Sequence, residues 1–325
     1  ATLYENEVIR PNVSGRFAEM LTAVETHPAM ITYLDNQRSI GPASEIATRA
    51  KRRRRRRGVG LNENLAREIL ELHTLGVDGG YTQSDVTTFA KVITGWSVGN
   101  SGKRSGEFEF REAAHEPGTK TLLGRSYSQS GKRQGIAVLE DLAASETTAR
   151  FLATKLARHF VADEPPASLI DRLVESYMSN DGELGKVYEA LVLSDEAWDP
   201  VRRKYKSPSD YLISSMRAFE NVPDNRRRLF KSLEFLGQTP FRPESPAGWP
   251  DTAEEWGGSD ALMKRITWAN SASNLAKRKA NPTALGDDIL GPAFTTSETR
   301  KAIRRAESAA QGMTMLLASP EFQRR

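Results

Sequence analysis

Apolar residues recur along most of the chain at intervals of three and four, the spacing that places them on one face of an α-helix. The clearest such stretch covers residues 62–75 and is closed by Gly76. A second stretch begins at Thr82, where Asp85 completes a pattern close to a capping box, and it extends to a stop at Gly95. The periodicity therefore predicts a mainly α protein.

Other helices are expected on both sides of this region. Near the start of the chain, Phe17, Leu21 and Val24 share an apolar face, and the step from His27 to Pro28 separates that helix from a short one that follows. The remaining predicted helices lie near residues 132–144, 146–161, 166–179, 183–195, 207–220, 225–236, 259–273 and 296–318.

Strand signals are sparse. Residues 107–110 alternate between glutamate and phenylalanine, residues 116–118 favour a turn, and residues 119–123 form a second short candidate strand. These segments predict one small β-hairpin at about residues 106–124. The expected fold class is thus mainly α, a multi-helix globular domain with one small β-hairpin.

Composition sets outer limits on this picture. The chain has 325 residues, which at about 150 residues per domain allows one large domain or two ordinary ones. The apolar content of 38% is, with glycine added, at the usual level for a soluble globular chain. No apolar run approaches the ~18 residues of a membrane span, so none is expected. The absence of cysteine excludes disulfides, thiolate zinc sites and a cysteine nucleophile.

The positive charge is concentrated in a single segment. The chain has 46 basic and 42 acidic residues, but without the run at 51–57 there are 39 basic residues against the same 42 acidic ones. Such a run predicts a solvated basic loop at residues 51–58 that could contact a polyanion, whereas specific nucleic-acid binding is disfavoured because the cations do not spread over a face. The cations are Lys51, Arg52, Arg53, Arg54, Arg55, Arg56 and Arg57.

Two polar residues fall in the apolar sector of the helix predicted over residues 62–75. On an α-helical wheel Glu68 lies beside Leu75, and His73 lies beside Ile69. A buried carboxylate or imidazole must be paired, protonated or bound to a metal. Either Glu68 meets an arginine or lysine and His73 bonds a backbone carbonyl, or both belong to a functional site. Because the two are about 140° apart on the wheel, a shared site would need further partners.

The chain has only four histidines, so those partners are limited. His115 lies at the predicted hairpin turn, where a loop could present its side chain for function or use it to hold the turn. His159 lies on the rim of an apolar helix face, where core packing is favoured, and His27 has the position of a helix-end residue. We therefore take Glu68, His73 and His115 as candidate catalytic residues, and the cofactor remains open.

No sequence motif assigns a reaction. Residues 58–63 (GVGLNE) contain two glycines of a dinucleotide-binding loop, but they follow an arginine run in place of a strand. The chain contains no phosphate-loop lysine motif, no Gly-x-Ser-x-Gly elbow and no EF-hand loop.

Several segments, spread over nearly the whole chain, carry a family resemblance. They are 61–78 (LNENLAREILELHTLGVD), 80–83 (GYTQ), 94–96 (TGW), 115–120 (HEPGTK), 123–124 (LG), 155–160 (KLARHF), 248–252 (GWPDT) and 319–322 (SPEF). Together they resemble the bacterial family called domain of unknown function 1800. The resemblance implies a mainly helical fold, a bacterial origin and a single family domain over residues 1–325 that lacks part of its N-terminal portion. It implies no reaction.

Two function hypotheses follow. The first is a scaffold or partner-binding protein of the bacterial envelope, with the periplasm or envelope favoured over the cytoplasm and with the basic run as a contact to another envelope protein or a polyanion. The second is a metal-dependent, hydrolase-like enzyme in which Glu68, His73 and His115 surround zinc, manganese or iron, or act as acid and base. The discriminating observation is whether these three side chains converge.

Overall fold

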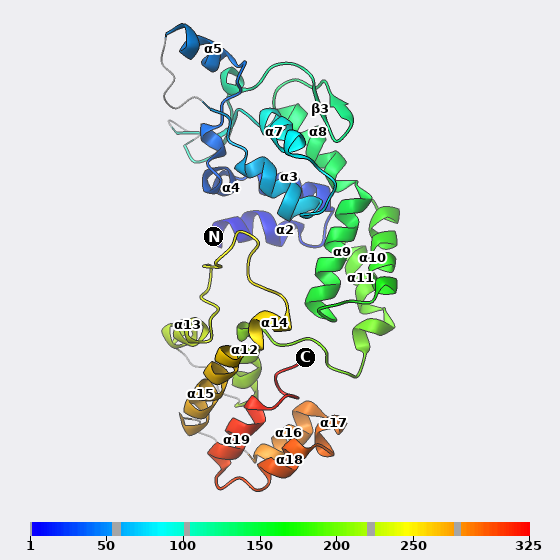
Figure 1. Ribbon diagram of the computed structural model, residues 1–325, viewed down its shortest axis with the longest axis vertical. Helices are drawn as coiled ribbons and strands as arrows, with labels where there is room; N and C mark the ends of the chain where they lie inside the picture. Colours follow the sequence, from blue (N-terminus) through cyan, green and yellow to red (C-terminus); the bar gives the residue numbers. More distant parts are fainter. Residues whose placement is uncertain (1, 54–59, 101–104, 220–224, 276–280) are drawn as a thin grey trace. The chain divides into compact units, whose positions relative to one another are not determined.

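The computed structural model describes residues 2–53, 60–100, 105–219, 225–275 and 281–325. They form two compact units: unit 1 comprises residues 1–156 and 166–194, and unit 2 comprises residues 157–165 and 195–325. Both consist mainly of helices (Figure 1), which confirms the predicted fold class.

Unit 1 is built from helices and two small sheets. Its helical elements are α1 (Thr2–Tyr4), η1 (Glu5–Ile9), α2 (Arg10–Asn12), α3 (Phe17–Thr26), α4 (Pro28–Tyr33), η2 (Asn36–Arg38), α5 (Glu45–Arg52), α6 (Asn64–Glu68), η3 (Ile69–Thr74), α7 (Gln83–Val92), η5 (Glu112–Ala114), α8 (Lys132–Ala143), the first part of α9 (Glu146–Phe160), α10 (Ala167–Ser179) and α11 (Leu184–Val192). Figure 1 shows α10 and α11 side by side.

The core of unit 1 surrounds α7. Thr82 and Asp85 form the predicted capping box, which fixes the start of this helix. Phe89 is fully buried, as is Trp96 just beyond the helix end. Gly135 of α8 lies against the Trp96 ring so closely that an added Cβ would be 2.3 Å from a ring atom. Glycine is therefore required at that crossing.

The two predicted strands form, but they do not pair with each other. β2 (Phe108–Phe110) pairs antiparallel with β1 (Trp96–Val98), and β3 (Lys120–Leu122) pairs antiparallel with β4 (Arg125–Tyr127). Positive φ angles at Leu123 and Gly124 suit the tight two-residue turn that joins β3 to β4. The expected single hairpin is thus replaced by two pairs, because this local turn supplies β3 with its own partner.

Unit 2 contains helices joined by irregular segments, and no strand pair is found among its described residues. Its elements are the end of α9, η6 (Asp195–Trp198), α12 (Pro208–Ala218), α13 (Arg226–Phe235), α14 (Ala253–Trp256), α15 (Ser259–Leu275), α16 (Pro282–Leu290), α17 (Pro292–Thr295), α18 (Glu298–Ile303) and α19 (Ala309–Ala318). α15 and α19 lie against each other (Figure 1). Tyr211, Phe294 and Phe322 are among the largest buried side chains of its core.

The basic run is only partly described. Lys51 and Arg52 end α5, which Ser44 caps at its start, and Arg53 follows as an exposed residue. Residues 54–59, which hold the rest of the predicted loop, lie outside the described residues.

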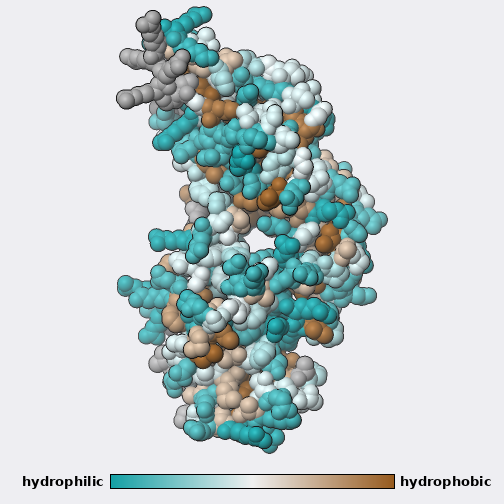
Figure 2. Space-filling view, viewed as in Figure 1, coloured by the Kyte–Doolittle hydropathy of each residue, from teal (hydrophilic) through white to brown (hydrophobic). Residues whose placement is uncertain are grey.

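The visible surface is mostly hydrophilic, with small hydrophobic groups between the polar ones (Figure 2). Within the described part of the chain, no helix is both long enough and apolar enough to cross a bilayer.

Candidate acid–base site

A π-helical turn brings Glu68 and His73 toward the same side of their helix. Residues 69–74 form η3, in which the Leu75 amide donates to the Leu70 carbonyl at 3.0 Å. A bond that spans five residues gives a wider turn than an α-helix, so residues five apart lie closer together around the axis than they do in an α-helix. The expected separation of about 140° assumed an α-helix. In the structure, each of the two side chains influences the pKa of the other.

Glu25 of α3 supplies the partner of His73. Phe17, Leu21 and Glu25 lie one helical turn apart and are buried together, so the carboxylate occupies a core position and is 0% exposed. Its Oε1 lies 2.8 Å from Nδ1 of His73, whose side chain is 26% exposed. A fully buried carboxylate therefore contacts an imidazole that solvent can reach.

The contact between Glu25 and His73 is an ion pair when His73 is protonated. Apart from His73, no described donor bonds either oxygen of Glu25. A buried carboxylate with so few donors is stabilised by a nearby positive charge. The protonated form of His73 supplies that charge.

The surroundings of His73 and Glu68 raise the pKa of both groups, which favours their protonated forms. Burial by itself lowers the pKa of His73, but the charge of Glu25, the hydrogen-bonding contact with it and the charge of Glu68 together outweigh burial and raise this pKa above 6.5. Burial raises the pKa of Glu68 above 4.5, and the charge of His73 opposes this only in part. A histidine and a carboxyl group with raised pKa values can exchange protons with a ligand near neutral pH.

Tyr4 and His27 complete the polar surroundings. Burial, followed by the charge of Glu25, raises the pKa of Tyr4, so its hydroxyl keeps its proton. The Tyr4 ring contacts His27 at 5.2 Å between centroids, and Nε2 of His27 lies 3.2 Å from Glu7. His27 also caps α4 by accepting from the Ala29 amide, so its predicted helix-end position is confirmed.

A cavity of about 630 Å³ begins just beyond η3 and is bounded by the turn at residues 75–79 and by α9. Gly76 has φ +86° and packs against Phe151, from which an added Cβ would be 2.8 Å away. Lys155 lies over the Phe151 ring at 5.2 Å, and its charge also acts on His73. The lining of the cavity thus begins two residues beyond His73, which does not line it.

His115 has different neighbours. Its Nδ1 donates to the Thr94 carbonyl at 2.9 Å, and its ring contacts Phe110 at 5.4 Å. Burial lowers its pKa, and the positive charge of Lys120 adds to this effect. Neither Glu68 nor His73 is among the groups that act on it. Glu68 and His73 therefore act on each other electrostatically, whereas His115 interacts with neither.

Glu68 itself is only partly buried, and no described arginine or lysine forms an ion pair with it. The expected cationic partner from another helix is therefore not found. The buried acid of this region is Glu25 instead. Within the described ranges, no group of three or more histidine, aspartate or glutamate side chains is arranged to hold a metal ion.

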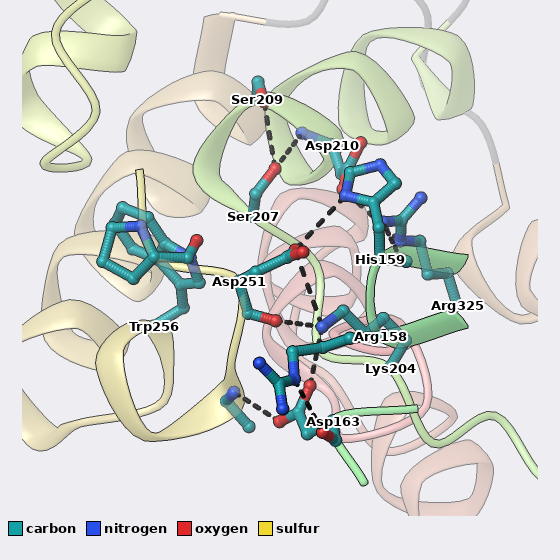
Figure 3. A network of polar contacts seen from close by, with 12 residues as sticks. Arg158, His159, Asp163, Lys204, Ser207, Ser209, Asp210, Asp251, Trp256 and Arg325 are labelled. Atoms are coloured by element: carbon teal, nitrogen blue, oxygen red, sulfur yellow. Dashed lines mark hydrogen bonds and ion pairs between the residues drawn. The ribbon is translucent and has the colours of Figure 1, made fainter. Parts of the chain in front are cut away.

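Unit 2 contains a second network, centred on Lys204, that the sequence did not suggest (Figure 3). Lys204 is 2% exposed, and its Nζ lies 2.7 Å from Oδ1 of Asp163 and also donates to the Asp251 carbonyl. Oδ1 of Asp251 lies 3.2 Å from Nδ1 of His159. The His159 side chain is 49% exposed, which corrects the expectation that it packs into the core. Two of the recognised segments, 155–160 and 248–252, meet in this network.

The structure thus defines a mainly helical protein with a buried carboxylate paired to an accessible histidine in unit 1. The family model described as "Protein of unknown function (DUF1800)" matches residues 1–324, so the chain belongs to this family, as its motifs predicted. No curated protein and no solved structure matches the chain.

Proposed function

We propose that this protein is an enzyme that uses general acid–base catalysis, with its site at the Glu25–His73 pair in unit 1. The observation that carries the proposal is the 2.8 Å contact between a carboxylate that is 0% exposed and a histidine that solvent reaches. Pairs of this kind orient an imidazole and stabilise its charged form during proton transfer.

The residues divide the work according to their burial. His73 is the proton carrier because it is the accessible member of the pair. Glu25 is a positioning residue that holds the imidazole and its charge from behind. Glu68, with its raised pKa, is a second proton donor beside His73. His115 is outside the proposed site because its charged neighbours are different ones.

Hydrolysis, the reaction suggested by the second sequence hypothesis, gives the first activity test. We expect the purified chain to hydrolyse at least one member of a nitrophenyl panel of esters, phosphates and glycosides, and His73→Gln to lower kcat/KM by about 100-fold or more, as loss of a general acid or base does. Glu25→Gln should mainly shift the pH profile. His159→Gln is the matched control and should keep the parent rate. A parent without activity on the panel, or His73→Gln with full activity, would contradict the proposal.

A second candidate function is that of a scaffold or partner-binding protein of the bacterial envelope. Lys51, Arg52 and Arg53 are exposed at the end of α5, and no described acidic side chain pairs with Arg52 or Arg53. Cations that are not neutralised within their own chain favour contact with an anionic polymer or an acidic protein surface.

Replacing all seven cations at 51–57 by glutamine tests this second candidate. We expect the variant to elute from a heparin column at a clearly lower salt concentration, because each lost cation removes a contact with a sulfate group of heparin and so weakens binding. Its melting temperature should stay close to that of the parent, since seven adjacent cations cannot be buried together and solvated charges contribute little to stability. Unchanged elution would show that the run does not make the main polyanion contact.

A further inference from the structure

A cavity of about 350 Å³ in unit 2 gathers positive charge without matching negative charge. It is bounded by α12, by the end of α16 and by the segment that precedes α12. Three cations line it, namely Arg202, Lys206 and Arg217, and Asp288 is its only acidic lining residue. Leu285, Ile289 and Phe322 supply apolar walls.

Lys206 is the central feature because it is only 8% exposed. Its backbone is fixed on both sides: the amide donates to the Gln323 carbonyl at 2.8 Å, and the carbonyl accepts from Arg265 at 2.7 Å. Its Nζ lies 3.9 Å from the centre of the Phe322 ring, and no described side chain forms an ion pair or hydrogen bond with it. The ammonium group is held in place without an anionic partner.

The groups behind Lys206 increase the positive potential. Burial, followed by the charge of Arg202, lowers the pKa of Lys206 to about 8. Arg265 is 1% exposed, lies between the rings of Tyr205 and Tyr211, and bonds neutral oxygens. The carboxylate of Asp210 favours the charged form of Lys206. This carboxylate also pairs with Arg325, whose Nε lies 3.4 Å from its Oδ2.

The two arginines at the rim leave their charge available. Arg217 is exposed and has no acidic partner among the described residues, while Arg202 makes only a long contact of 3.5 Å to the Ile289 carbonyl. Guanidinium groups of this kind bind oxyanions through paired N–H donors. A ligand oxyanion would therefore contact cations at the base and at the rim of the cavity.

We propose that this cavity binds a small organic anion, with its oxyanion group on Lys206, Arg202 and Arg217 and its apolar part against Leu285, Ile289 and Phe322. The oxyanion chemistry is shared by phosphate monoesters and carboxylates. The apolar walls and the volume favour an oxyanion carried on an organic group over free inorganic phosphate. This site is independent of the acid–base site proposed in unit 1.

Isothermal titration calorimetry with phenyl phosphate, benzoate and inorganic phosphate tests the proposal on the intact chain. Phenyl phosphate or benzoate should bind at least about tenfold more tightly than inorganic phosphate, because only the aromatic probes use the apolar walls. Stronger binding of phenyl phosphate would identify phosphate monoesters as the source, and stronger binding of benzoate would identify carboxylates. Absence of binding by all three probes, or equal binding of inorganic phosphate, would overturn the proposal.

Proton uptake gives a signature specific to Lys206. Titrations at pH 8.5, in buffers with different ionisation enthalpies, should show uptake of a fraction of a proton per bound anion, because the anion favours the ammonium form. Lys206→Met should abolish this uptake and weaken binding by about tenfold or more, as expected for loss of a charged hydrogen bond. Binding enthalpies that do not depend on the buffer would contradict the proposal.

A rim variant keeps the test decisive if Lys206→Met fails to fold. Arg217→Ala changes an exposed side chain and should weaken binding of the preferred probe about tenfold while leaving thermal unfolding unchanged. Arg305→Ala, an exposed cation that does not line the cavity, is the matched control and should bind as the parent does. Equal affinities of the Arg217→Ala and Arg305→Ala variants would overturn the assignment.

Discussion

Replacing His73 by alanine should lower the free energy of unfolding by about 3 kcal/mol at pH 7, because it removes one partner of a buried ion pair. Glu25 would keep its buried position, and no other donor or cation of the described residues pairs with it. Denaturant titrations of parent and variant at pH 7 measure the effect.

A second substitution separates charge from packing. The double variant His73→Ala/Glu25→Gln should be more stable than His73→Ala alone by about 1 kcal/mol or more, since it removes the unpaired buried charge. Glu7→Gln is the matched control, because Glu7 pairs with His27 but is 59% exposed. This change should lower the free energy of unfolding by less than about 1 kcal/mol. If the double variant is the less stable one, the carboxylate charge is not the cause of the loss.

The pH dependence of the parent has a definite sign. The pKa of His73 is raised in the fold, so the stability that it contributes is complete below its ordinary value of 6.5 and is lost as the pH rises through the folded value. The raised pKa of Glu68 acts in the same direction from its ordinary value of 4.5 upward. The decline in stability above pH 6.5 should therefore be reduced in His73→Ala.

The sequence predicted the fold class because its helices follow from local periodicity and capping. Thr82 and Asp85 show this, since their side chains fix the start of α7 from positions three residues apart. The pairing of the strands was harder to predict from the sequence, because it depends on contacts between distant residues. The partner of β2 is β1, which begins at Trp96, directly after the predicted helix stop at Gly95. The Trp96 carbonyl also accepts a bond from the distant side chain of Asn36.

The candidate site was predicted only in part, for a physical reason at each residue. Glu68 and His73 were found because polar residues in an apolar sector are visible in a helical wheel. The angle expected between them does not apply, since a wheel assumes the turn of an α-helix and η3 is a π-helix. Glu25 was missed although the spacing of Phe17, Leu21 and Glu25 carries the signal, because Val24 was assigned to the apolar face in its place.

Unit 2 offers the corresponding test of a buried cation. Lys204 is 2% exposed and contacts two carboxylates, with Nζ 2.7 Å from Oδ1 of Asp163 and 3.6 Å from Oδ1 of Asp251. The other oxygen of Asp163 accepts from the Ala253 amide at 2.6 Å, so this network also holds the start of α14. Trp256 follows in that helix and donates from its indole to the Pro250 carbonyl at 2.9 Å. Loss of the lysine charge should therefore affect the whole segment around Asp251.

Replacing Lys204 by methionine keeps the length of the side chain and removes its charge. We expect a loss of about 3 kcal/mol in the unfolding of unit 2, because two carboxylates lose the cation between them. Tryptophan fluorescence suits the measurement, since four of the five tryptophans, at positions 198, 249, 256 and 268, belong to unit 2. Lys264→Met is the matched control: its lysine pairs with Asp260, which is 79% exposed, and the change should cost less than about 1 kcal/mol. Equal losses in the two variants would show that the charge of Lys204 does not hold the Asp163–Asp251 network together.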